Sequence, residues 1–100
     1  MVEGDTYQFE GSRGNGEATQ PTAFAFTVES GGVLNFVGAN NTSVSGMIQG
    51  NSANVVVQYE GEPISFDGRI ENGVIEGEFK EGGVEGPFQV QMVTGGQTNF

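Results

Sequence analysis

The chain has 100 residues, no cysteine and no histidine, and its thirteen acidic side chains against three basic ones give a formal net charge of −10. This length fits one domain with its own core, while the missing residue types exclude disulfides, thiolate metal sites and histidine chemistry. The acidity disfavours nucleic acid and anionic membrane surfaces as partners.

No apolar run approaches the length of a membrane span, so we expect no membrane-spanning segment. Residues 1–6 show no basic segment followed by an apolar one, so no signal peptide is visible. A signal that had been cleaved earlier would leave a secreted or periplasmic location open. The compartment is therefore unknown from the sequence.

Short runs of alternating apolar and polar residues, separated by glycine and asparagine turns at roughly ten-residue intervals, predict an all-β fold. We expect a single antiparallel eight-stranded meander, closing into a small β-barrel because the first and last strands can pair antiparallel. The single domain spans 1–100, with the barrel over 6–93, one long connection at 12–21 and a loose tail at 94–100. In chain order the expected strands are 7–11, 24–29, 33–38, 42–49, 54–60, 63–71, 74–81 and 84–93.

The last three strands carry the clearest register signal. An Asn-Gly pair at 72–73 is preferred in two-residue hairpins, and a Gly-Gly pair follows at 82–83. Both turns place apolar residues on the same face, and a slip by one residue would reverse every side chain. The expected pairs are Ile70 with Ile75, Gly68 with Gly77, Phe66 with Phe79, Phe79 with Gly86, Gly77 with Phe88 and Ile75 with Val90.

The earlier turns extend this pattern backwards. Two-residue turns are expected at 61–62 and 51–52, and three-residue loops at 39–41 and 30–32. Two-residue alternatives to the two longer loops would turn the third strand over. The expected pairs are Tyr59 with Ile64, Val57 with Phe66, Val55 with Gly68, Ile48 with Val55, Gly46 with Val57, Leu34 with Gly46, Phe26 with Phe36 and Phe24 with Gly38.

The predicted inner face is apolar and carries no charge. Glycines at 11, 38, 46, 68, 77 and 86 also fall on it, where they allow the sheet to bend and aromatic rings to cover the exposed backbone. The remaining inner residues are Tyr7, Phe9, Phe24, Phe26, Val28, Leu34, Phe36, Val44, Ile48, Val55, Val57, Tyr59, Ile64, Phe66, Ile70, Ile75, Phe79, Phe88, Val90 and Met92.

The repeated phrase Ile70-x-x-Gly73-x-Ile75-x-Gly77-x-Phe79 is similar to hairpins of compact bacterial lipocalin-like domains. Together with eight meandering strands over 6–93, the chain resembles a small calycin-type barrel, the group that holds lipocalins, fatty-acid-binding proteins and avidins. The first strand lacks the Gly-x-Trp element of lipocalins, and the chain has no tryptophan. The resemblance is architectural and transfers no ligand-binding residue.

An eight-stranded barrel holds one small molecule or is filled by its own side chains. The leading hypothesis is non-enzymatic binding of a small apolar ligand inside the barrel, without a cofactor. A filled core is the alternative, because phenylalanine opposite glycine also compensates volume. The expected ligand-binding residues are Tyr7, Phe24, Phe26, Phe36, Tyr59, Phe66, Phe79 and Phe88.

Two other functions stay open. A structural or interaction module would dock a partner, or form a homodimer, through an apolar row on the less acidic outer face, with Val33, Val37, Met47 and Val56 as the interface. A small barrel enzyme is the third, although no catalytic residue stands out. Asp67, Glu76, Glu78 and Glu85 form an acidic outer patch, but their spacing matches no calcium loop, so we expect no metal site.

Overall fold

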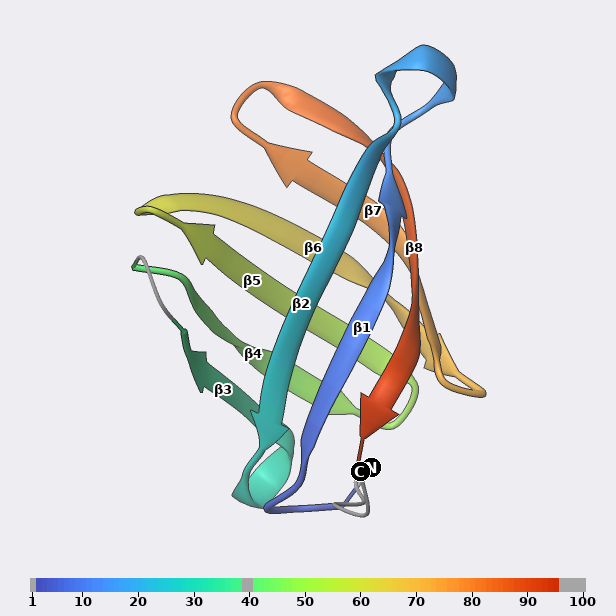
Figure 1. Ribbon diagram of the computed structural model, residues 1–100. Coiled ribbons are helices and arrows are strands. Elements are labelled where there is room, and N and C mark those ends of the chain that lie inside the picture. Colours follow the sequence, from blue (N-terminus) through green and yellow to red (C-terminus); the bar gives the residue numbers. More distant parts are fainter. Residues whose placement is uncertain (1, 39–40, 96–100) are drawn as a thin grey trace.

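The computed structural model describes residues 2–38 and 41–95, and in them the chain forms one closed barrel of eight antiparallel strands in meander order (Figure 1). This confirms the predicted all-β fold class. Two short 3-10 turns, η1 (Gly16–Ala18) and η2 (Ser30–Gly32), lie in the connections. The strands are β1 (Thr6–Arg13), β2 (Gln20–Val28), β3 (Val33–Val37), β4 (Ser43–Gln49), β5 (Ser52–Tyr59), β6 (Glu62–Glu71), β7 (Val74–Glu81) and β8 (Val84–Gly95).

The predicted register of β6, β7 and β8 is confirmed at every pair. Asn72 and Gly73 both take positive φ, as a tight hairpin turn of the type I′ class requires. Ile70 faces Ile75, and Phe79 faces Gly86. β8 continues to Gly95, two residues beyond its predicted end, and the rest of the predicted tail, 96–100, lies outside the described residues.

The registers predicted for β5 against its two neighbours were wrong by two residues. Val57 faces Ile64 and Val44, in place of the predicted partners Phe66 and Gly46. The β5–β6 turn is formed by residues 60–61, which both have positive φ, and the β4–β5 turn by residues 50–51. A register shift of two residues keeps each side chain on the same face of the sheet, so the residues predicted to point inward and outward are unchanged.

The connection between β1 and β2 is shorter than predicted. β1 continues to Arg13 and β2 already begins at Gln20, so the connection spans only 14–19. Arg13 therefore occupies an inward position opposite Phe88, and Glu81 lies opposite Ile64 on the same inner side. The prediction of an inner face without charge was wrong at this end of the barrel.

The seam between β2 and β3 is short. Its predicted register is confirmed, because Val28 faces Leu34 and Thr27 faces Asn35, but the described ladder ends there. The predicted pair of Phe26 with Phe36 is not formed, because β2 and β3 diverge beyond Thr27 and Asn35 although both strands continue (Figure 1). The predicted pair of Leu34 with Gly46, on the other side of β3, is confirmed.

Two kinds of glycine shape the sheet. At Gly77 a Cβ would overlap the carbonyl oxygen of Asp67, so the backbones of β6 and β7 approach more closely than any side chain would allow. At Gly86 a Cβ would meet the ring of Phe79 at 3.1 Å, so this glycine makes room for an aromatic side chain. Both effects let a small number of strands curl into a narrow barrel.

Candidate functional site

The middle of the barrel is filled by aromatic rings. Phe66 lies 5.3 Å from Phe24 and 4.9 Å from Phe88, measured between ring centroids, and Phe9 lies 5.4 Å from Phe26. These rings are almost completely buried. Ring separations of this size correspond to direct packing, so the phenylalanines of the predicted ligand set form the core in this structure, apart from the half-buried Phe36 beside it.

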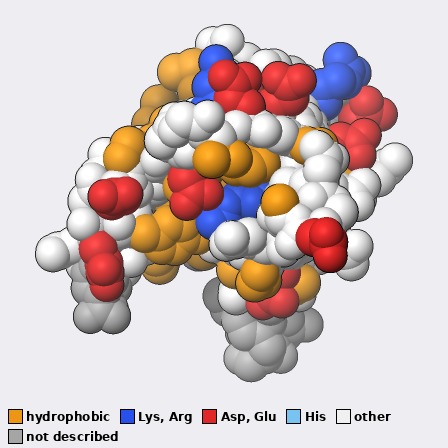
Figure 2. Space-filling view, turned by 90° about the horizontal axis from the view of Figure 1, so that it is seen from above, with side chains coloured by type: hydrophobic (Ala, Val, Ile, Leu, Met, Phe, Trp, Pro, Cys, Tyr) orange, Lys and Arg blue, Asp and Glu red, His pale blue; other side chains and the backbone are white. Residues whose placement is uncertain are grey.

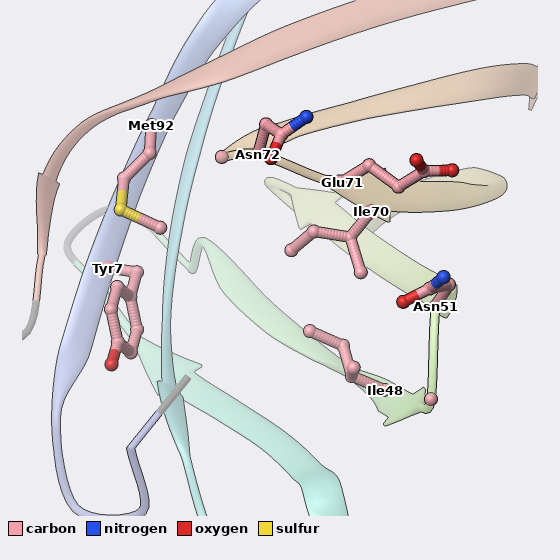
Figure 3. Close-up of a pocket in the computed structure, with 9 residues that line it drawn as sticks. Tyr7, Ile48, Asn51, Ile70, Glu71, Asn72 and Met92 are labelled. Carbon is pink, nitrogen blue, oxygen red and sulfur yellow. The ribbon is translucent and has the colours of Figure 1, made fainter.

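A pocket of about 490 Å³ opens at the end of the barrel that holds the β4–β5 and β6–β7 turns (Figure 3). Tyr7 and Met92 stand on one side of it, and Ile48 and Ile70 on the other. This volume lies within the range of small-molecule sites. The rim is polar and is formed by Gly50, Asn51, Glu71, Asn72 and Gly73.

One wall of the pocket is a fixed aromatic side chain. Tyr7 is held in place because its hydroxyl oxygen accepts a hydrogen bond of 2.7 Å from the backbone N–H of Val2. The pocket therefore combines a fixed aromatic wall with half-buried aliphatic side chains.

The opposite end is closed by a polar cluster. Figure 2 looks onto this end and shows a basic side chain at its centre, among acidic and hydrophobic ones. Arg13 is 9% exposed, and its Nε donates to Glu81 at 3.1 Å, while Nη1 donates to the Pro21 carbonyl at 3.0 Å and to Thr22 Oγ1 at 2.9 Å. Its guanidinium also lies over the ring of Phe79, 5.9 Å from the centroid.

Tyr59 completes this end. Its hydroxyl donates a hydrogen bond of 2.7 Å to the carbonyl of Ala23 on β2. Burial raises the pKa of Tyr59, nearby Arg13 opposes this effect, and nearby Glu81 adds to it. The protonated hydroxyl is thus favoured in the folded protein, and it links β5 to β2.

The predicted outer row is only partly continuous. Val33 faces Met47 directly and both are exposed, as is Val37 at the end of β3. Val56 faces Ser45, because of the shifted β5 register, so it lies diagonal to Met47. The predicted register of β5 would have placed Val56 directly opposite Met47, and this alignment is not formed, whereas the interface role of these residues stays a prediction.

Two of the outer acids make hydrogen bonds with side-chain amides. Asp67 accepts a hydrogen bond of 2.7 Å from the side-chain amide of Asn54, and Glu76 accepts one of 3.0 Å from Gln89. Within residues 2–38 and 41–95, no group of three or more acidic side chains is arranged to hold a metal ion. The same part of the chain contains no helix that is long and apolar enough to cross a bilayer.

Comparison with known proteins gave no relative. No protein-family model matches the chain, and neither a curated protein nor a solved structure gives a significant match.

Of the predicted ligand residues, Tyr7 alone lines the open pocket. Tyr59 and Phe79 belong to the closed end, and the other phenylalanines lie in the core or beside it. The other pocket walls, Ile48, Ile70 and Met92, were on the predicted inner face but were not chosen as ligand contacts. For Ile48 and Ile70 the available signal was their position two residues before a turn, because inner residues closest to a turn border the mouth of a barrel.

Proposed function

We propose that the protein binds a small apolar ligand, without catalysis, in the pocket bordered by Tyr7, Ile48, Ile70 and Met92. The observation that carries this proposal is the concentration of half-buried apolar side chains around a volume of about 490 Å³. Apolar pockets with a few polar groups at the rim are the usual form of a small-molecule site. The calycin-like architecture supports the same function by analogy.

The pocket chemistry narrows the ligand class. The aliphatic walls suit an apolar body, and the side-chain amides of Asn51 and Asn72 offer both donors and acceptors to a polar end group. Glu71 lies on the same rim and the whole chain is strongly acidic, so an anionic end group would be repelled. A neutral molecule with one apolar body and one polar end fits best.

The test is a fluorescence titration with Nile red, a neutral apolar dye. We expect saturable binding by the wild-type protein and a loss of affinity of at least about tenfold in I70W, because the indole fills the pocket. V84W is the matched control, since Val84 is exposed on the β7–β8 hairpin at the other end. Equal dye binding by I70W and V84W would overturn the assignment of the pocket.

A further inference from the structure

The ladder between β2 and β3 has only two described pairs, so backbone groups of both strands lie beyond it without a ladder partner at this seam. The N–H of Glu29 donates to the carbonyl of Val33 at 2.7 Å, which identifies a hydrogen-bonded pair. Because such pairs alternate along an antiparallel ladder, the odd-numbered residues of β2 direct their N–H and C=O groups toward β3. The carbonyl of Ala23 follows this rule, since it accepts the Tyr59 hydroxyl from that side.

On β3 the open groups belong to Val37. The N–H of Gly38 donates to the carbonyl of Thr42 at 2.8 Å, so even-numbered residues in this part of the chain face β4. Val37 therefore faces β2, where Ala25 would be its partner. The described ladder stops at Thr27 and Asn35, so Ala25 and Val37 have no partner across this seam within the part of the chain that the structure describes.

The seam has an apolar floor and small walls. Phe24 and Phe26 are buried beneath β2, and Phe36 and Tyr59 are half-buried beside them and pack against the core. Ala23 and Ala25 are small outward residues, so side chains do not shield the exposed edge. An unpaired strand edge of this kind accepts an additional strand through main-chain hydrogen bonds.

The net charge of the protein indicates which kind of segment could bind to this edge as an added strand. The run 30–59 and the whole of β2 contain no charged residue, whereas the chain as a whole carries −10. A second copy would bring the same charge to the edge and would be repelled, and so would an acidic segment. A segment with lysine or arginine would be attracted by the field of the whole protein and would find no like charge on β2 or β3.

We propose that the edge of β2 at Ala23–Ala25 binds an extended, basic segment of another protein, which adds a strand antiparallel to β2. Main-chain groups of Ala25 supply the pairing, and the half-buried side chains of Phe36 and Tyr59 contact alternate side chains of the bound segment. This site lies on the wall of the barrel and is separate from the ligand pocket at its open end.

The test uses ¹⁵N-labelled protein and the hexapeptide acetyl-Lys-Val-Lys-Val-Lys-Val-amide. We expect saturable chemical-shift changes centred on Ala23, Ala25 and Val37, and slower hydrogen exchange of the Ala25 amide. Two control peptides should not produce these changes. In one, glutamate replaces each lysine. In the other, alternate peptide nitrogens are methylated, so the edge that would pair with β2 has no N–H donors.

Two protein variants at one position separate pairing from charge. A25P removes the N–H that the bound strand needs and should weaken binding at least about tenfold, whereas A25S keeps that N–H and should bind like the wild type. Shift changes centred on the acidic face of β6–β8, equal binding of the methylated peptide, or no binding at millimolar peptide would overturn the proposal. A dimer formed through the same edge would overturn the choice of occupant.

Discussion

Arg13 and Glu81 are 68 positions apart in the chain, yet Nε of Arg13 lies 3.1 Å from Oε1 of Glu81 at the closed end of the barrel. The contact joins the end of β1 to the end of β7, and through Thr22 it also reaches the start of β2. The two ends of the barrel thus differ in kind: one is closed by a buried guanidinium, and the other opens into a pocket with aliphatic walls and a polar rim.

We predict that R13M lowers the free energy of unfolding by about 2 kcal/mol, because Thr22, Glu81 and the Pro21 carbonyl lose a charged donor while the alkyl volume is kept. E81Q should cost less, because the Glu81 side chain is 44% exposed and water replaces part of its interaction. Urea denaturation of both variants provides the measurement. A larger loss in E81Q than in R13M would contradict this assignment.

The Tyr59 hydroxyl makes stability depend on pH at alkaline values. Its pKa is higher in the folded chain than its ordinary value of 10.0, so the folded state holds this proton more tightly than the unfolded state does. Its contribution is complete below the unfolded pKa of about 10 and is lost as pH rises through the folded pKa. We predict that the stability difference between wild type and Y59F, about 1 kcal/mol at neutral pH, shrinks above pH 10. A stability difference that grows with pH would show that folding lowers the pKa of Tyr59 and does not raise it.

Gly77 and Gly83 provide a matched pair of glycine substitutions on neighbouring segments. G77A should destabilise the barrel by about 3 kcal/mol or more, because the new Cβ overlaps backbone of β6 that cannot move independently. At Gly83 a Cβ meets nothing within 4 Å, so G83A should leave stability unchanged or raise it by about 0.4–1 kcal/mol. Thermal unfolding of the two variants compares them directly.

Proline scanning tests whether the β2 edge is open in the free protein. Proline is tolerated in a strand where the N–H faces no ladder partner, so A25P should unfold within about 1 kcal/mol of the wild type. V56P, in the middle of a strand that is paired on both sides, should cost about 3 kcal/mol or more. Similar destabilisation by both variants would mean that the amide of Ala25 is already bonded within the barrel.

The sequence predicts most of the strand register in the barrel wall, but fewer of the residues that form the two ends of the barrel. Period-two alternation and the Asn72-Gly73 turn determine the β6–β8 register, because that turn pair has one strongly preferred geometry. The β5–β6 turn was misplaced because Glu60 takes a positive φ, which glutamate rarely adopts and which no local pattern indicates. Arg13 was assigned to a loop because no apolar neighbour continues the alternation beyond Gly11.

The residues of the candidate site were also only partly predictable from the sequence. Which residues point inward follows from the strand pattern, but which inward residues fill the core depends on their level along the barrel axis. That level changes with each two-residue shift in register, so the sequence marked Ile48 and Ile70 only by their closeness to turns and did not show that the phenylalanines fill the core.

The central claim is that ligand enters the open end and leaves the phenylalanine core undisturbed. Methyl NMR of protein labelled at isoleucine, valine and methionine, titrated with Nile red, tests it most directly. We predict saturable shifts at Ile48, Ile70 and Met92, with little change at the fully buried methyls of Val55 and Ile75. Shifts centred on Val55 and Ile75, or no saturable change at the three mouth residues, would contradict the claim.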